Sequence, residues 1–299
     1  MMNEPHLGGT YDQQLAAARW CEAEGLVSYD RCDQFLSGRE PTPDATDAFA
    51  VLAGLARETE EIRLCVLVSP ITFRHPAVIA KNAATIDQMS GGRLDLGVGT
   101  GWMELEHEAL GIPFPEWGER WERFEEALDY LDAAFAEGKG SYQGEYYSLD
   151  ADVKPKPTGI RMVIGGSGPK RTPTLAGQRA DEYNFFFCPP DEAKAKIEVM
   201  RAAAEDRKVE ATMMGSALVA RTDSDYREEL SRAASENNLE PDDLESRLRA
   251  RGYPIGTPNQ AAETIAALEE AGVDRIYVQW LDLDRSDRMF ETIDILRGR

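Results

Sequence analysis

A repeated alternation of short apolar strands with helix-forming segments constrains the fold more than any other feature of this sequence. Seven complete strand-then-helix units can be counted, with strands that start near residues 26, 62, 93, 161, 181, 213 and 275. Such alternation implies a parallel sheet, and eight units would close a TIM-type (β/α)8 barrel. Residues 1–4 supply at most the carboxyl end of a first strand. We therefore expect an α/β barrel whose first strand is truncated, is missing or begins upstream.

The chain length indicates how many domains to expect. With 299 residues the chain fits one large barrel, so we expect a single domain over residues 1–299. Segments near 101–118, 139–152 and 223–252 break the alternation. We interpret them as insertions: an irregular acidic stretch, a small hairpin and a charged helical segment, respectively.

Net charge and hydropathy exclude several kinds of partner. The formal net charge of −21 argues against nucleic acid and against an anionic membrane surface, because both require clustered Lys and Arg. No apolar run approaches the roughly 20 residues of a membrane helix. The N-terminus lacks the basic and apolar regions of a secretory signal. We expect a cytoplasmic protein that acts on a small-molecule substrate.

The four cysteines are Cys21, Cys32, Cys65 and Cys188. They are far apart, form no Cys-x-x-Cys pair and have no histidine at a spacing suited to zinc. We expect buried, reduced thiols and no metal site.

A glycine-rich strand end stands at Leu94–Trp102. Gly97, Gly99 and Gly101 remove side chains there, so a flat ligand can approach the backbone. Alone, this motif would suit an S-adenosylmethionine methyltransferase. However, it follows at least two strand–helix units and leads into an irregular segment instead of a helix, which argues against that class.

In a barrel of this kind, function lies at the carboxyl ends of the strands. Informative residues follow five of the predicted strands: Asp33 and Gln34, then Ser69, then Thr100, Gly101 and Trp102, then the turn that starts at Gly165, and finally Leu281 and Asp282. These positions are our candidate site.

The turn after the strand predicted to start near residue 161 is the best candidate phosphate site in the sequence. It consists of Gly165, Gly166, Ser167, Gly168, Pro169, Lys170, Arg171 and Thr172. Its glycines let backbone N–H groups converge, the following helix offers its positive end, and two cations are adjacent. The alternative is a tight strand-to-helix turn without a ligand.

Two histidines have open interpretations. His75 precedes a helix-starting proline and suits either an acid–base role or a structural one. His107 stands among Glu104, Glu106 and Glu108, a pattern typical of a solvated charged segment.

Several motifs in order resemble the bacterial luciferase-like flavin and deazaflavin oxidoreductases, and most closely their probable F420-dependent subfamily. They are Asp33–Phe35, Arg63–Phe73 followed by His75–Ala77, Thr85–Arg93, Leu96–Trp102, Ala109–Phe114, Gly118–Arg120, Ile164–Thr174 and Ala180–Glu182. The resemblance covers residues 4–190 strongly and the C-terminal region moderately.

The resemblance implies a barrel that binds coenzyme F420 or FMN. Asp33 and Ser69 would border the ring, with a non-prolyl cis peptide bond at Val66–Leu67 behind it. Thr100, Gly101 and Trp102 would line the pocket, and Gly165–Thr172 would hold the phosphate. Catalytic roles would fall to Asp33, Gln34 and Trp102. We also expect a homodimer.

Gln34 departs from the family pattern, in which histidine is common at this position. Glutamine forms hydrogen bonds but does not titrate. The leading hypothesis is hydride transfer between F420 and a small organic substrate. The alternatives are an FMN-dependent monooxygenase, a non-catalytic flavin-binding barrel and the methyltransferase.

Overall fold

The computed structural model describes residues 1–38, 43–281 and 283–299. The barrel strands are β1 (Met2–Asn3), β2 (Ser28–Arg31), β3 (Arg63–Pro70), β4 (Leu94–Gly99), β7 (Arg161–Gly165), β8 (Glu182–Phe186), β9 (Glu210–Gly215) and β12 (Arg275–Trp280). They form a closed barrel in the order β1, β12, β9, β8, β7, β4, β3 and β2. The expected α/β barrel is thus confirmed, with a first strand of only two residues.

The contacts divide the chain into two compact units. The first contains Met1 and residues 3–165, and the second contains Met2 and residues 166–299. We describe each by itself, and the expectation of a single domain stays a prediction. No helix among the described residues is long and apolar enough to cross a membrane.

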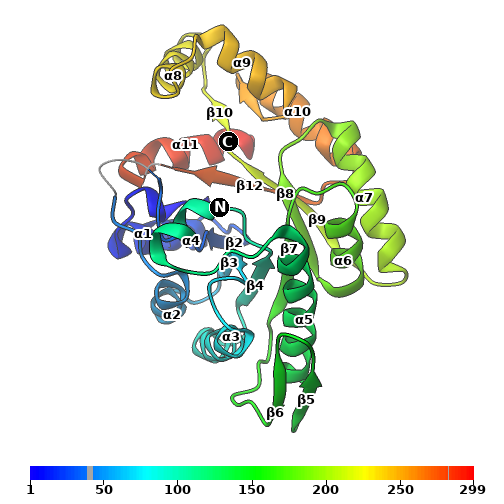
Figure 1. The fold of residues 1–299 in the computed structure, drawn as a ribbon. Coiled ribbons are helices and arrows are strands. Elements are labelled where there is room, and N and C mark those ends of the chain that lie inside the picture. The colour runs from blue at the N-terminus through cyan, green and yellow to red at the C-terminus, as the bar shows by residue number, and fades with distance from the viewer. Residues whose placement is uncertain (39–42, 282) are drawn as a thin grey trace. The chain divides into compact units, whose positions relative to one another are not determined.

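Helices follow the strands of the first unit as the sequence indicates. They are η1 (Pro5–Leu7), α1 (Tyr11–Ala23), α2 (Ala48–Glu58), α3 (Pro76–Ser90), α4 (Glu104–Leu110) and α5 (Trp117–Phe135). The antiparallel strands β5 (Gly140–Gln143) and β6 (Ser148–Ala151) form the expected hairpin, which lies alongside α5 (Figure 1).

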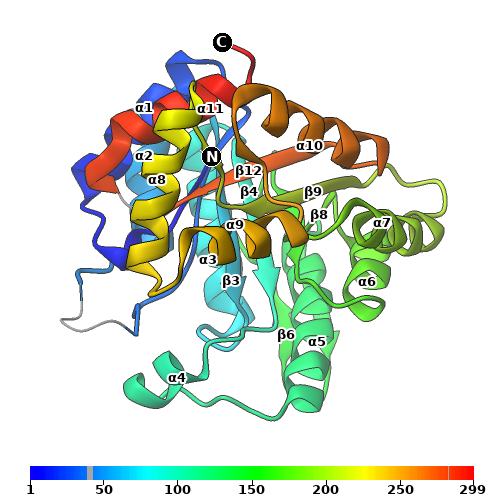
Figure 2. The same cartoon turned by 90° about the horizontal axis from the view of Figure 1, so that it is seen from above.

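The second unit continues the alternation. Its helices are α6 (Arg171–Arg179), α7 (Pro190–Ala204), α8 (Asp223–Glu236), α9 (Pro241–Ala250), α10 (Pro258–Glu270), η2 (Leu283–Arg285) and α11 (Ser286–Leu296). Helices α6 and α7 lie side by side (Figure 2). The charged segment 223–252 is helical, as expected, and a small parallel pair, β10 (Leu218–Val219) and β11 (Ile255–Gly256), flanks it.

Three boundaries differ from the sequence prediction. Strand β2 starts at Ser28, because Ser28 is the first residue in register with β3 and Val27 is exposed. The strand expected from Met213 to Ala220 is divided into β9 and β10. The irregular segment 101–118 contains α4, which ends where Gly111 takes the left-handed conformation with φ 68°.

The non-prolyl cis peptide bond joins Leu67 and Val68. The expected position, Val66–Leu67, is therefore wrong by one residue. Val66 is still in regular register with Leu96 of β4, and the register shifts only between Val66 and Ser69. The irregular part of β3 consequently begins after Val66.

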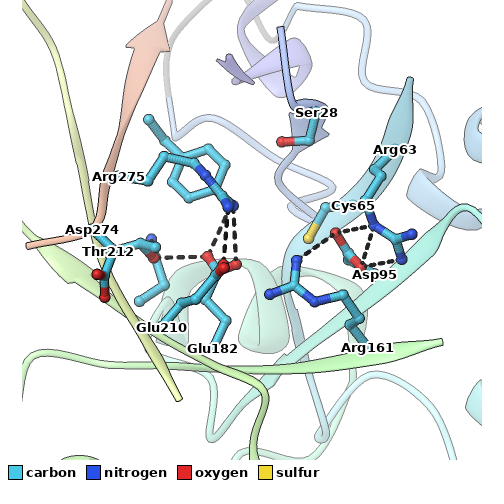
Figure 3. A network of polar contacts seen from close by, with 12 residues as sticks. Ser28, Arg63, Cys65, Asp95, Arg161, Glu182, Glu210, Thr212, Asp274 and Arg275 are labelled. Carbon is cyan, nitrogen blue, oxygen red and sulfur yellow. Dashed lines mark hydrogen bonds and ion pairs between the residues drawn. The ribbon is translucent and has the colours of Figure 1, made fainter. Parts of the chain in front are cut away.

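Charged side chains occupy the amino ends of the strands in the first unit. Arg63 starts β3 and donates from Nε to Asp95 Oδ1 at 3.0 Å. Arg161 starts β7, and its Nη1 lies 3.8 Å from Asp95 Oδ2 (Figure 3). The buried Asp95 carboxylate thus faces two guanidinium groups, so its charge is compensated at the strand ends.

The second unit carries a similar cluster around Glu182. This carboxylate has no exposed surface and accepts hydrogen bonds from Thr212 Oγ1 at 2.7 Å and Tyr277 Oη at 2.9 Å. Arg275 lies 3.4 Å from Glu182 and 2.9 Å from Glu210 (Figure 3). Glu182, Glu210 and Arg275 each start a strand, so this cluster also lies opposite the carboxyl ends where barrel function is expected.

Candidate active site

Asp33 lies two residues beyond β2, and its side chain is buried. Ser69, near the carboxyl end of β3, donates from Oγ to Asp33 Oδ2 at 2.6 Å. Arg74, between β3 and α3, donates from Nη2 to Oδ1 at 3.0 Å and from Nη1 to Oδ2. A buried carboxylate is thus held by a bidentate guanidinium and a hydroxyl. Asp33 and Ser69 thus lie in contact, while their predicted place beside a cofactor ring stays a prediction.

Arg74 is itself enclosed by its neighbours. Its guanidinium also pairs with Asp47, the N-cap residue of α2, and lies over the rings of Phe49 and Phe35 at 4.8 and 5.4 Å. Burial raises the pKa of Asp33, while the Arg74 cation and the Ser69 hydroxyl oppose this. Asp33 and Arg74 therefore form one electrostatic unit.

His107 is buried, so the expectation of a solvated segment around it is wrong. Its Nδ1 lies 2.8 Å from the carbonyl oxygen of Met103, and its Nε2 lies 2.7 Å from Thr72 Oγ1. A carbonyl only accepts, so Nδ1 carries the proton and Nε2 accepts from the threonine. Phe73 and Phe114 flank the ring, and burial lowers the pKa of His107. The imidazole is held neutral.

Glu106 is buried as well, because α4 turns its side chain toward the loop after β2. Its carboxylate accepts from the backbone N–H of Phe35 at 2.9 Å and of Leu36 at 3.4 Å. Burial raises the pKa of Glu106, and the two N–H groups oppose the shift. Glu106 thereby fixes the segment that follows Asp33 and Gln34.

Gly101 sits where a side chain would not fit. Its φ is +79°, and a Cβ would lie 3.0 Å from Thr72 Oγ1 and 3.2 Å from Pro70 Cβ. Arg120 of α5 donates to the Gly101 carbonyl at 2.7 Å and lies over the Phe114 ring at 3.8 Å. The segment just after β4 is therefore held by a hydrogen bond from α5.

Gly97 and Gly99 of β4, together with Gly165 of β7, lie close to β3. A Cβ on Gly97 would lie 2.2 Å from the Val66 carbonyl oxygen, and one on Gly99 would lie 3.0 Å from Val68 Cγ2. A Cβ on Gly165 would lie 2.8 Å from Val68 Cγ1. These glycines therefore make room for the irregular part of β3. That they also border a ring stays a prediction.

The predicted phosphate turn lies at the start of α6. Lys170 is the N-cap residue of this helix. Among the described residues, its side chain makes no capping hydrogen bond to the backbone N–H groups of the first turn. Gly166 has φ +151°, and a Cβ there would lie 3.1 Å from Thr172 Cγ2. Lys170 and Arg171 are exposed beside the turn. A helix start without a side-chain cap, beside two cations, suits an anion.

The remaining predicted residues make fewer contacts, and Asp282 lies outside the described residues. Trp102 is 72% exposed, and Thr100 is half-buried. Gln34 is half-buried and donates from Nε2 toward Met103 Sδ at 3.3 Å. Val66 and Leu67 are buried in β3.

Sequence reasoning missed Arg74 and Glu106. Arg74 lies in the loop between β3 and α3, so it too follows a strand, as Asp33 does, and an arginine there is the natural partner of a carboxylate. Glu106 gave no such signal, since only the burial of α4 distinguishes it from its acidic neighbours. His75 takes the structural role: its Nδ1 accepts from the Ala77 N–H at 3.1 Å and caps α3.

A closed eight-stranded barrel whose strands alternate with helices along the chain defines the TIM-type fold. The chain belongs to the luciferase-like monooxygenase family, whose model matches residues 3–275.

Its relatives include both deazaflavin and flavin enzymes. Over 142 residues the chain is 39% identical to an F420-dependent glucose-6-phosphate dehydrogenase of Microbacterium testaceum, covering 46% of this chain and 42% of the relative. Over 275 residues it is 26% identical to an FMNH2-dependent dimethylsulfone monooxygenase of Pseudomonas fluorescens, covering 82% and 75%. The chain thus spans less than half the length of the F420-dependent relatives that it matches.

A solved structure supports the fold. An F420-dependent secondary alcohol dehydrogenase, in complex with an F420–acetone adduct, superposes with a TM-score of 0.80 at 20% identity and covers 99% of both chains. This likeness shows a shared barrel fold. The expected homodimer and cytoplasmic location stay predictions.

Proposed function

We propose that this chain is an oxidoreductase that transfers a hydride between coenzyme F420 and a small organic substrate. The family and its F420-dependent relatives support this class of reaction. The observation that carries the proposal is the buried Asp33 carboxylate, held by Ser69 and Arg74 at the ends of β2 and β3.

The cofactor would supply the hydride chemistry when bound. The protein would supply orientation. Asp33, Ser69 and Arg74 are already fixed relative to one another, so no side chain has to reorganise when a polar ring edge approaches them. The start of α6, with Gly166 and Thr172, would bind the phosphate through backbone N–H groups. The lack of a side-chain cap at Lys170 supports this assignment.

Gln34 bears on the source of any proton that is transferred in the proposed reaction. Its side chain does not titrate, and both ring nitrogens of the nearby His107 are engaged in hydrogen bonds. We infer that any proton transferred with the hydride comes from substrate or water.

The Gln34→His variant tests this inference. A histidine at position 34 would add a titrating group, so we expect higher proton-coupled activity and a new ionisation near pH 6.5 in the pH–rate profile. Gln34→Asn, which does not titrate, is the matched control. A profile for Gln34→His that is identical to that of the wild type would contradict the inference.

FMN-dependent monooxygenation is the second candidate. The longer match to the dimethylsulfone monooxygenase, over 82% of this chain, favours it specifically. The two candidates differ in chemistry, because a reduced flavin activates oxygen whereas a deazaflavin carries hydride.

Titration of the purified protein with each cofactor separates the candidates. We expect tighter binding of F420 than of FMN, and a substrate-dependent loss of the absorbance of oxidised F420 with a panel of small alcohols. Tighter FMN binding with oxygen consumption would favour the monooxygenase. Tight binding without turnover of any donor would favour a non-catalytic barrel.

A further inference from the structure

Three potential metal ligands converge near the N-terminus. Glu4 directly follows β1, Cys32 directly follows β2, and His6 lies in η1. The backbone N–H of Cys32 donates to the carbonyl oxygen of Asn3 at 3.1 Å, so the ends of the two strands lie side by side. The single 3-10 turn of η1 then brings His6 back over them.

The three donor atoms have the spacing of a coordination site. His6 Nδ1 lies 3.1 Å from Glu4 Oε2 and 3.2 Å from Cys32 Sγ. All three ligand atoms lie within 4.8 Å of one another, and all three residues are buried. Tetrahedral zinc with ordinary bond lengths would put its N and O ligands about 3.3 Å apart and its N and S ligands about 3.5 Å apart.

The arrangement does not suit a nucleophilic triad. A Cys–His–carboxylate triad uses one ring nitrogen for the thiol and the other for the carboxylate. Here the same nitrogen, Nδ1, faces both Glu4 and Cys32. One nitrogen cannot donate to a carboxylate and accept from a thiol at once, as a triad would require, whereas all three groups could bind one cation placed between them.

We propose that Glu4, His6 and Cys32 form a zinc site that ties the first strand of the barrel to the second. Thiolate, imidazole and carboxylate together suit Zn²⁺, while Mg²⁺ and Ca²⁺ take oxygen ligands. On binding, the Cys32 thiol loses its proton to solvent, and no redox change occurs. With two anionic ligands and a neutral imidazole, the loaded site carries no net charge, which suits its burial.

No local motif indicates this site, because its ligands are far apart along the chain. His6 and Cys32 are 26 positions apart, and only the pairing of β1 with β2 unites them. The proposal is independent of the cofactor that the barrel binds.

Cobalt and zinc titrations of the chelator-treated full-length protein test the proposal. We expect one equivalent of Co²⁺ to give a thiolate charge-transfer band and the visible bands of a tetrahedral ion. Cys32→Ser should abolish the charge-transfer band and weaken zinc binding at least about 100-fold, more than the loss of an outer-sphere partner. Cys65→Ser, at another buried cysteine, should leave both unchanged.

Two further outcomes are decisive. If circular dichroism shows that Cys32→Ser is unfolded, Glu4→Gln, which keeps the side-chain size, should show the weakened zinc binding instead. Weak binding of several equivalents without a charge-transfer band would indicate adsorption to the acidic surface and overturn the proposal. An unchanged band in Cys32→Ser would overturn it too.

Discussion

At the residue scale, the environment of Asp33 decides what this carboxylate can do. A buried carboxylate without a partner would be protonated or expelled to solvent, since the loss of hydration costs several kcal/mol. Arg74 offsets this loss with two hydrogen bonds, and Ser69 adds a third. The pair can therefore present a fixed dipole to a ligand.

Replacement of Arg74 tests this coupling. Arg74→Met should lower the free energy of unfolding by about 3–5 kcal/mol at neutral pH, because it leaves Asp33 buried without a counter-charge. The double variant Arg74→Met/Asp33→Asn should recover part of this loss in urea unfolding. Arg19→Met, in an exposed pair with Glu58, should cost less than about 1 kcal/mol. Strictly additive losses in the double variant would refute the coupling.

His107 gives a prediction for pH. Its pKa is lowered by burial, so the unfolded chain binds the proton more tightly and the stability contributed by His107 is present above about pH 6.5. As the pH falls below that value, this contribution is lost at up to about 1.4 kcal/mol per pH unit until the folded-state pKa is passed. The stability advantage of the wild type over His107→Gln should therefore shrink between pH 7 and pH 5 in urea unfolding. A constant difference would contradict this account.

At the element scale, β3 and β4 are adapted to each other. The irregular part of β3 carries Val68 toward β4, and Gly97 and Gly99 provide the space. Glycine in a strand interior normally weakens it, so its presence here reflects a close backbone approach. The glycine-rich motif at Leu94–Trp102 resembles a nucleotide-binding loop in sequence. Inside the first unit, its glycines allow β3 and β4 to pack closely.

The start of α6 makes the second element-scale prediction. Gly166→Val should weaken binding of the phosphate-bearing cofactor strongly, because the side chain would meet Thr172 and φ +151° disfavours a branched residue. Fluorescence titration measures the affinity, and circular dichroism should show an intact fold. Gly118→Val, at an unhindered glycine of α5, is the control. Unchanged affinity for Gly166→Val would refute the phosphate assignment.

At the scale of the whole molecule, the polar groups at the two ends of the strands have different tasks. Asp95 and Glu182 lie at amino ends, where barrel residues serve stability. Asp33 and Ser69 lie at carboxyl ends, where barrels carry function. We therefore predict that a buried carboxylate paired with an arginine stabilises the barrel at the amino ends of the strands and serves ligand binding at the carboxyl ends.

Glu182→Gln tests the stabilising role. The amide can still accept from Thr212 and Tyr277, but it no longer neutralises Arg275, so we expect a loss of about 2–4 kcal/mol in urea unfolding. Cofactor affinity should not change. Asp223→Asn, in an exposed pair with Arg227, should cost less than about 0.5 kcal/mol. Equal losses in the two variants would contradict the assignment.

Local patterns in the amino-acid sequence are enough to predict the barrel and most of its elements. Apolar strands alternate with helices whose ends carry clear signals, such as Pro76 at the start of α3 and Gly91 after its end. It also placed Asp33 and Ser69 at strand ends, because position after a strand is readable from local pattern. For the first strand the sequence left a truncated, a missing or an upstream strand open, and the structure has the two-residue β1.

Which of these residues come into contact depends on how the chain folds. Arg74 binds Asp33 across 41 positions, Glu106 reaches Phe35 across 71, and His6 meets Cys32 across 26. No local pattern encodes such distances, since they follow from strand pairing and from the way α4 folds back. Burial likewise separates Glu106 and His107 from their solvated neighbours, because it depends on what packs over them rather than on the residues beside them.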